Sequence, residues 1–125
     1  MQASIQGQAR GGAGIETDQL LAAYGTLRPG EINYRLLADE PGEWLDGWVR
    51  GYRGEADGYP AFWYRPDGER LPVKVFHSAE LPRLWTHLDW FEGKDYPRIE
   101  VPVELADGRT VQANLYQRVG EPPGA

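Results

Sequence analysis

The segment RIEVPVELADGRTVQANLY, residues 98–116, constrains the fold of this 125-residue chain most strongly. Its apolar side chains recur at every second position on both sides of Asp107-Gly108, which is the pattern of two antiparallel strands joined by a tight turn. Pro102 falls on the outward parity, which favours an edge strand or a bulge at that point. The segment therefore predicts a β-hairpin with one buried face. Its inward residues would be Ile99, Val101, Val103 and Leu105 on the first strand and Val111, Ala113 and Leu115 on the second.

Four other short segments have the character of strands. The run from Leu20 to Tyr24 is continuously apolar and stops at Gly25, as expected of a strand buried on both faces. The other three are rich in aromatic or β-branched residues and end in turn-forming residues. They cover residues 48–53, 61–64 and 72–77.

One segment, SAELPRLWTHLDWFEG, departs from this period of two. Its apolar residues fall at the spacing of a single helical stripe, with Ser78 placed to cap the start and Gly93 to end the helix. The stripe consists of Leu81, Leu84, Trp85, Leu88 and Phe91, and a weaker helix is expected over residues 33–37. We therefore expect an α+β domain, a small mixed β-barrel or strongly curved sheet with one main amphipathic helix.

Composition sets the boundaries of the domain. Residues 1–18 are rich in Gly, Gln and Ala, and residues 120–125 read GEPPGA, so both are expected to be flexible. The ordered domain is expected over residues 19–119. No internal repeat or linker divides it.

Charge and residue content exclude several functional classes. The chain has no cysteine, so thiolate chemistry is excluded, and its net charge of −6 argues against nucleic acid as a partner. No apolar run approaches the roughly 20 residues of a membrane span, and no secretory signal is present, so a cytoplasmic location without a membrane partner is expected. His87, Asp89 and Glu92 would diverge around the helix, so a metal site is not expected.

The segment YGTLRPG, residues 24–30, stands at the end of the first expected strand. Glycine after a strand allows a sharp turn, and successive amides in such a turn form a concavity that binds anions. The segment lacks the GK[ST] sequence of a phosphate loop, so a carboxylate suits it better than a nucleotide. The alternative is an ordinary turn, in which Gly and Pro are common.

Glu92 is the most informative single residue for chemistry. It follows Trp90 and Phe91 at the carboxyl end of the expected helix. Apolar neighbours and the helix dipole both disfavour its ionised form and raise its pKa towards neutrality, as a general acid or base requires. The alternative is a plain surface glutamate. Asp89, three residues earlier, is either a partner carboxylate or a solvated helix residue.

Four segments together resemble the gamma-glutamylcyclotransferase family in the wide sense, including AIG2-like proteins and gamma-glutamylamine cyclotransferases. They are YGTLRPGEIN (24–33), GYPA (58–61), LDWFEGKDYPR (88–98) and ANLY (113–116). The resemblance implies a small mixed β-barrel with peripheral helices, in which the YGTL loop faces Glu92 across a pocket. One departure is Val73-Lys74, which stands where family members commonly carry Gly-Glu.

The resemblance also implies an enzyme that cyclises a small γ-glutamyl compound and releases 5-oxoproline and an amine without a cofactor. Glu92 would be the acid and base, and the amides of Gly25, Thr26 and Leu27 would bind the substrate carboxylate. Tyr24 and Tyr96 would supply pocket hydroxyls. Arg28 and Arg98 would either attract the anion or form structural ion pairs. A non-catalytic module that binds a carboxylate metabolite is the alternative, and the leaving amine and oligomeric state stay open.

Overall fold

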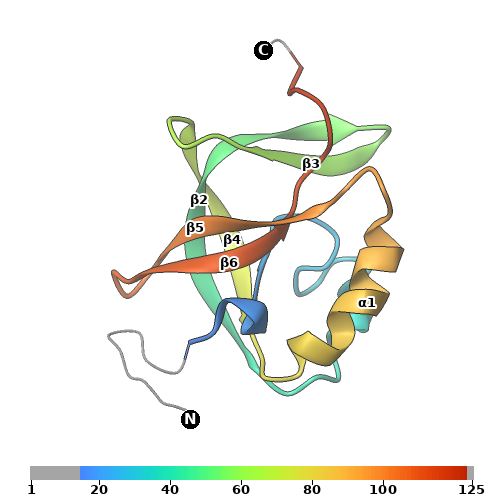
Figure 1. Ribbon diagram of the computed structural model, residues 1–125, viewed down its shortest axis with the longest axis vertical. Helices are drawn as coiled ribbons and strands as arrows, with labels where there is room; N and C mark the ends of the chain where they lie inside the picture. Colours follow the sequence, from blue (N-terminus) through green and yellow to red (C-terminus); the bar gives the residue numbers. More distant parts are fainter. Residues whose placement is uncertain (1–14, 124–125) are drawn as a thin grey trace.

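The structure is a computed structural model that describes residues 15–123 (Figure 1). These residues form six strands, one α-helix and two short 3-10 helices. In chain order they are η1 (Thr17–Gln19), β1 (Leu20–Ala23), η2 (Tyr34–Leu36), β2 (Glu43–Ala56), β3 (Tyr59–Tyr64), β4 (Glu69–His77), α1 (Leu81–Glu92), β5 (Arg98–Leu105) and β6 (Thr110–Tyr116).

The sheet closes on itself. Its strand order is β3-β2-β4-β1-β6-β5, and an additional pairing between β2 and β5 joins the two sides of the order. Five strands thus form a closed barrel, while β3 lies outside it as the far half of the β2–β3 hairpin. The pairing of β1 with β6 is parallel and the other pairings are antiparallel. The expected α+β fold, a small mixed β-barrel with one main helix, is confirmed.

Closure depends on β2, which is 14 residues long. Its first part pairs with β4, its last part with β3, and two residues near its middle, Gly47 and Trp48, with β5. At Gly47 a Cβ would lie 2.9 Å from Val103 Cγ1, and at Gly51 it would collide with the Trp63 carbonyl. Glycine at these two positions lets the strand bend while neighbouring chains approach closely.

The β5–β6 hairpin has the predicted register. Val101 faces Ala113 and Val103 faces Val111, and all four lie on the interior side of the barrel. Gly108 in the turn has φ +95°, a conformation that favours glycine. β2 pairs only with the carboxyl end of β5, so Pro102 lies where β5 has a single neighbour, as its parity suggested.

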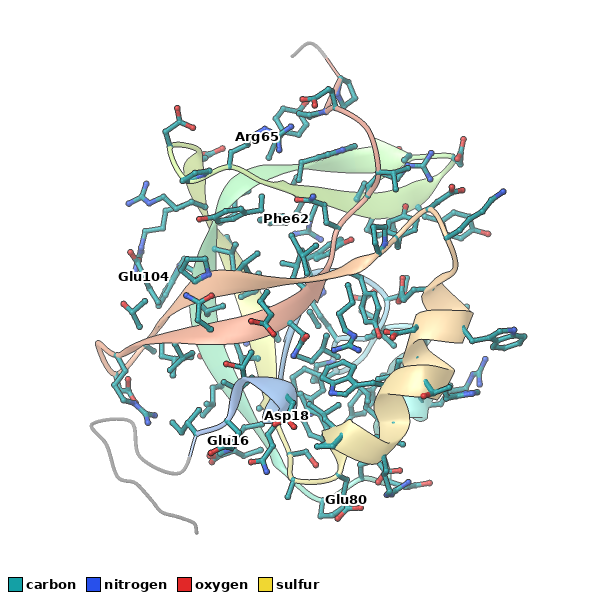
Figure 2. All side chains as sticks on the ribbon, in the orientation of Figure 1. Glu16, Asp18, Phe62, Arg65, Glu80 and Glu104 are labelled. Atoms are coloured by element: carbon teal, nitrogen blue, oxygen red, sulfur yellow. The ribbon has the colours of Figure 1, made fainter. Side chains whose placement is uncertain are left out.

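Two apolar clusters hold the domain together. One fills the barrel, and the other lies between the outer face of the barrel and α1. β1 contributes to both, because Leu20 and Ala22 face the interior while Leu21 and Ala23 face the helix. Its continuous apolar sequence follows from this double burial. Figure 2 shows the side chains that occupy the space between the sheet and α1.

The helical region differs in detail from expectation. α1 begins at Leu81, and its N-cap residue, Glu80, makes no side-chain capping bond. Ser78 instead accepts a hydrogen bond from the Glu80 amide and donates one to the Pro41 carbonyl. Phe91 is only half-buried, so it does not complete the core stripe. The weaker helix expected over residues 33–37 is a single 3-10 turn.

Contacts of the domain extend past the expected boundaries at residues 19 and 119. The Trp85 indole donates to the Asp18 carbonyl over 2.9 Å, and Asn114 Nδ2 donates to the Thr17 carbonyl over 2.8 Å. At the other end Arg65 donates to Glu121 over 2.7 Å. The rest of the expected flexible ends, residues 1–14 and 124–125, lies outside the described residues. In the part of the chain that the structure describes, no helix has the length and apolarity needed to span a membrane.

Candidate active site

A cleft of about 610 Å³ opens beside the carboxyl end of α1. Its walls come from the end of β1, the loop after it, the β2–β3 turn, the segment after α1 and the last residues of β6. The structure brings together in this cleft the six residues to which the resemblance assigns catalysis or substrate binding. These residues are Tyr24, Gly25, Thr26, Leu27, Glu92 and Tyr96.

The loop over residues 24–27 is held from behind through its carbonyl groups. Three successive carbonyls accept hydrogen bonds: Tyr24 from Arg53 Nη2 (2.7 Å), Gly25 from Arg28 Nε (3.0 Å) and Thr26 from the Asn33 amide (2.9 Å). The Thr26 hydroxyl also accepts from Asn33 Nδ2 over 2.9 Å. The backbone of the loop is thereby fixed in one orientation.

This orientation decides where the loop amides point. No described peptide bond is cis, and in a trans peptide the N–H lies opposite the preceding carbonyl. Each carbonyl of residues 24–26 accepts a hydrogen bond, so the amide that follows it, at Gly25, Thr26 and Leu27, points away from that bond. Among residues 15–123 these three amides have no hydrogen-bond acceptor. Three adjacent amides without an acceptor are of the kind that can bind an anion.

Two guanidinium groups strengthen the positive potential of the loop. Arg53 and Arg28 donate to the adjacent carbonyls of Tyr24 and Gly25, so the two side chains lie close together. Burial and the nearby charge of Arg28 both lower the pKa of Arg53. Arg28 also pairs with Glu31, at 3.7 Å. Arg28 therefore both bonds the loop backbone and brings a positive charge close to it.

The structure gives a different reason for glycine at position 25 from the one expected from the sequence. Its φ is not in the left-handed region, so a sharp turn does not require glycine there. A Cβ at this position would instead lie 3.2 Å from Pro60 Cβ, so the residue is small because β3 packs against the loop.

Glu92 is the last residue of α1, and its side chain is half-buried at the cleft. Burial raises the pKa of Glu92 to about 7. This is the direction expected from sequence, and it leaves both protonation states populated near neutral pH. Gly93, with φ +82°, ends the helix through a bond from its amide to the Asp89 carbonyl and so fixes where Glu92 emerges.

Three tyrosines, Tyr24, Tyr96 and Tyr116, line the cleft together with this carboxyl group. Burial is the main cause of a raised pKa at each of them, and the charge of Glu92 also raises these pKa values. Tyr24 donates to the Tyr116 carbonyl over 2.6 Å, and Tyr96 donates to the Pro60 carbonyl over 3.3 Å. Tyr116 was not singled out from the sequence. The sequence feature that could have identified it is its position in ANLY. Strand alternation places Tyr116 on the face opposite to the barrel interior, and therefore towards α1.

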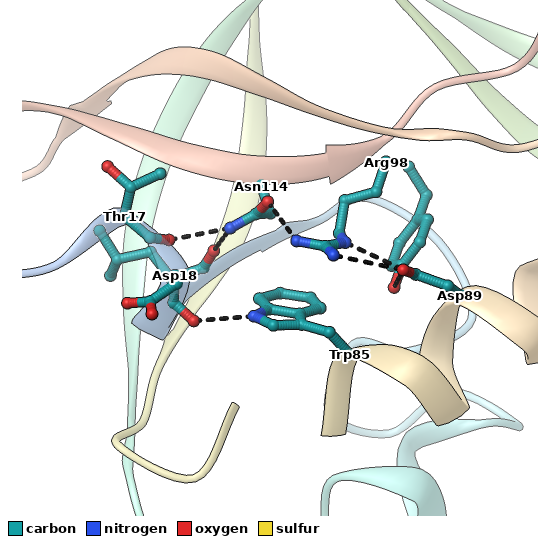
Figure 3. A network of polar contacts seen from close by, with 8 residues as sticks. Thr17, Asp18, Trp85, Asp89, Arg98 and Asn114 are labelled. Atoms are coloured by element: carbon teal, nitrogen blue, oxygen red, sulfur yellow. Dashed lines mark hydrogen bonds and ion pairs between the residues drawn. The ribbon is translucent and has the colours of Figure 1, made fainter. Parts of the chain in front are cut away.

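Asp89 has a role that neither sequence alternative described. Its carboxylate accepts two bonds from Arg98, at 2.9 and 3.2 Å, and one from the Tyr116 hydroxyl at 2.6 Å (Figure 3). Burial opposes its ionisation, but the bonds from Arg98 and Tyr116 hold the pKa of Asp89 below its ordinary value. Arg98 also donates to Asn114 over 2.8 Å, so it is tied into a structural network.

Other sequence candidates lie apart from this chemistry. Lys74, at the departure from the Gly-Glu pattern, is exposed on β4, pairs with Asp46 and does not line the cleft. His87 stacks on Trp90, which is 76 % exposed. Within residues 15–123 no three His, Asp or Glu side chains come together in a way that could hold a metal ion.

Comparisons with known proteins agree with this architecture. The chain matches the family described as gamma-glutamyl cyclotransferase, AIG2-like, over residues 21–123. A comparison with curated proteins found no match. The solved structure of a mouse AIG2-like protein is 21 % identical with a TM-score of 0.65, and the match covers 84 % of this chain and 80 % of that one.

Two further solved structures share the fold. YkqA from Bacillus subtilis is 29 % identical with a TM-score of 0.66; the match covers 81 % of this chain but 36 % of YkqA, so this chain spans about a third of that protein. A structure described as gamma-glutamyl cyclotransferase is 18 % identical with a TM-score of 0.54, covering 81 % of this chain and 66 % of that one. Since the family match spans most of the chain, the protein belongs to the gamma-glutamyl cyclotransferase, AIG2-like family.

Proposed function

We propose that the protein is a cyclotransferase that releases 5-oxoproline and an amine from a small γ-glutamyl compound. One observation carries the proposal beyond family membership. A half-buried glutamate with a pKa of about 7 shares a cleft with a loop whose three successive amides have no acceptor among residues 15–123 and so can bind a carboxylate. An acid-base group and an anion site at one end of a pocket suit a zwitterionic substrate.

The loop fixes one end of the substrate. The α-carboxylate binds the amides of Gly25, Thr26 and Leu27, where the charges of Arg28 and Arg53 add attraction. This anchor leaves the α-amine and the γ-carbonyl to fold back toward Glu92. Because nucleophile and electrophile belong to one molecule, the protein's main tasks are to hold the reactive conformation and to move a proton.

Glu92 moves that proton. Its ionised form takes a proton from the α-ammonium group, and the freed amine attacks the γ-carbonyl carbon to form the C–N bond of the five-membered lactam. Protonated Glu92 then returns the proton to the departing nitrogen, and the original amide C–N bond breaks. The extra proton left on the new ring nitrogen passes through the regenerated Glu92 carboxylate to the released amine. The products are 5-oxoproline and a free amine, with the carboxylate regenerated. A pKa near 7 suits both directions of transfer.

The test is release of 5-oxoproline by the purified protein from a panel of γ-glutamyl compounds whose leaving amine is an amino acid, an ε-lysyl group or a polyamine. Glu92→Gln is the matched inactive variant, and Glu100→Gln on the exposed side of β5 is the control. Release from at least one compound, lost in Glu92→Gln only, supports the proposal. Binding without release across the panel would favour the non-catalytic carboxylate-binding module.

A further inference from the structure

The turn of the β2–β3 hairpin forms one wall of the cleft and projects past the barrel (Figure 1). Beyond Gly51, β2 pairs with β3 alone. Phe62, which is fully buried in the barrel interior, anchors the base of this part of the hairpin. The tip, residues 55–60, therefore extends from a fixed base. The tip residues that line the cleft are Ala56, Asp57, Tyr59 and Pro60.

Arg118, which follows β6, connects this tip to a second wall of the cleft. Its guanidinium pairs with Asp57 of the hairpin turn at 3.2 Å and with Asp95 of the segment after α1 at 3.6 Å. The same group lies 5.5 Å from the centre of the Tyr96 ring and donates to the Tyr96 hydroxyl. One cation thus joins carboxylates from two separate walls of the cleft.

The backbone that carries Arg118 is held in place. The Arg118 amide donates to the Phe62 carbonyl over 3.1 Å, and the Val119 amide donates to the Asp95 carbonyl over 3.0 Å. The side chain of Arg118 is 20 % exposed, whereas those of Asp57 and Asp95 are 76 % and 52 % exposed. Arg118 and Asp95 are therefore the fixed members of this group, and Asp57 on the tip is the member that can move away.

The charges of these three residues set the balance between a closed and an open tip. Arg118 attracts Asp57 and also shields it from Asp95, because the two carboxylates share one guanidinium. Without the guanidinium the two like charges would repel each other. Because the pair with Asp57 is exposed to solvent, its attraction is modest and is weakened by salt. A contact of this strength holds the tip closed and can still be broken when a ligand enters.

We propose that residues 55–60 form a lid on the cleft and that Arg118 is the positioning residue that holds this lid closed. Opening breaks the contact of Arg118 with Asp57 and keeps its contact with Asp95, so the hairpin tip moves while the segment after α1 stays in place. Opening also separates the Pro60 carbonyl from the Tyr96 hydroxyl, which donates to it over 3.3 Å in the closed state. Arg118 acts on the cleft through the lid and takes no part in proton transfer.

Spin labels can measure the lid in the full chain without a ligand, because the chain has no cysteine and two introduced cysteines are the only labelled positions. Glu55→Cys on the tip is paired with Thr86→Cys on the exposed face of α1, and the distance between the two labels is measured by double electron–electron resonance. A second pair, Thr86→Cys with Glu100→Cys on β5, leaves out the tip.

We expect Arg118→Gln to raise the ratio of long to short distances about two- to fivefold for the tip pair and to leave the second pair unchanged. Arg118→Lys keeps the charge and should keep the lid closed as in the parent. The matched control is Arg109→Gln, which breaks an exposed ion pair with Asp107 in the β5–β6 turn and should change neither pair of labels.

The response to salt separates an electrostatic contact from a packing role of Arg118. In the parent, raising NaCl from about 0.02 M to about 0.5 M should lengthen the tip distances, because salt screens the attraction of Arg118 for Asp57. In Arg118→Gln the same change should shorten them, because salt then screens the repulsion between Asp57 and Asp95. Adding Asp57→Asn to Arg118→Gln should remove the response. Asparagine tolerates the φ of +55° at this position, so the turn is kept.

Unchanged tip distances in Arg118→Gln, or the same salt response in Arg118→Gln as in the parent, would overturn the lid. A shift of both label pairs would show that Arg118 supports the whole domain, and it would overturn the lid as well. If Arg118→Gln is not folded by circular dichroism, Asp57→Asn decides, because it should lengthen the tip distances alone and abolish their response to salt.

The 5-oxoproline assay separates this inference from the proposed function, because the distance measurement needs neither substrate nor turnover. A tip that opens as expected in a protein that releases no 5-oxoproline ends the cyclotransferase proposal and leaves the lid standing. Release of 5-oxoproline by a protein whose tip does not respond to Arg118→Gln overturns the lid alone.

Discussion

Gly25 packs directly against Pro60, and a Cβ built on Gly25 would lie 3.2 Å from the Cβ of Pro60. This contact joins the loop over residues 24–27, which is the proposed carboxylate site, to the start of β3. The Pro60 carbonyl also accepts a hydrogen bond from the Tyr96 hydroxyl, so Pro60 contacts both the proposed carboxylate site and Tyr96. The distance between the loop over residues 24–27 and Pro60 therefore depends on the absence of a side chain at position 25.

Gly25→Val is expected to abolish binding of L-glutamate while the domain still folds. The new side chain must displace Pro60 or the loop, and a shift of the loop misdirects its three amides. Gly54→Val is a matched control, because its Cβ would be equally close, 3.2 Å, to a Tyr52 ring atom outside the cleft. Calorimetry and circular dichroism check both variants. Undiminished binding in folded Gly25→Val would mean that the loop is not the carboxylate site.

Arg53→Gln is expected to weaken both L-glutamate and glutarate, by about tenfold each. The substitution frees the Tyr24 carbonyl that Arg53 holds at 2.7 Å and removes a charge behind the loop. L-Glutamate and glutarate differ only in the α-ammonium group, so a change at a carboxylate site should affect both ligands alike. Arg50→Gln, which removes an exposed arginine of the same strand, is the control. A selective effect on one ligand would contradict the assignment of Arg53 to the carboxylate.

The hairpin and the helix were predictable because their signals are local. Asp107-Gly108 specifies the turn, and the alternation of Val101 and Val103 specifies the face, within a few residues of each other. Closure of the barrel was not predictable in the same way. It pairs Gly47 and Trp48 with residues at the end of β5, which lie more than fifty positions later in the chain. No local sequence pattern predicts such a pairing.

The residues of the candidate site differ in the same way, because some have local sequence signals and others are defined by tertiary contacts. Glu92 and the loop amides could be proposed from the sequence because a helix end and a loop directly after a strand have local consequences for charge and hydrogen bonding. Arg53 and Tyr116 were missed because their roles come from tertiary contacts. Arg53 reaches back 29 positions to the Tyr24 carbonyl, and Tyr116 reaches 27 positions to Asp89. Asp89 itself looked like a solvated helix residue because its partner, Arg98, lies on another element.

Val103→Asp is expected to destabilise the domain by several kcal/mol, about 3–5, because an unpaired carboxylate would enter the fully buried interior of the barrel. Gln112→Asp, at an exposed position of the partner strand, is the control and should cost little. Thermal unfolding measures both. An unchanged midpoint for Val103→Asp would contradict the register of the hairpin.

The pH dependence of activity follows from the raised pKa of Glu92. Only the ionised carboxylate can take a proton from the α-ammonium group, so kcat/KM at low pH should rise about tenfold per pH unit and level off near pH 7. The measurement is the initial rate of 5-oxoproline release between pH 5 and pH 8 at fixed ionic strength. A limb that levels off below pH 5 would show that an ordinary carboxyl group, and not a buried Glu92, controls the rate.

Glu92→Gln separates catalysis from structure, because glutamine keeps the volume of glutamate but cannot carry a proton. We expect it to abolish turnover, and Glu92→Asp, which retracts the carboxylate by about 1 Å, to lower kcat by about a hundredfold. The stability of Glu92→Gln should rise, although its activity is lost. The folded-state pKa of Glu92 lies above its ordinary value, so ionisation costs stability progressively as pH rises from about 4.5 to about 7.

Glu92→Gln removes that cost. Its thermal midpoint should match the parent's below pH 4.5 and exceed it above pH 7, by the equivalent of about 1–2 kcal/mol once solvent screening in the open cleft is allowed for. Glu100→Gln, at an exposed position of β5, should show neither effect. A Glu92→Gln protein that released 5-oxoproline at the parent rate would end the catalytic role of Glu92. A stability difference that did not vary with pH would show that the carboxyl group is not titrating in a buried site.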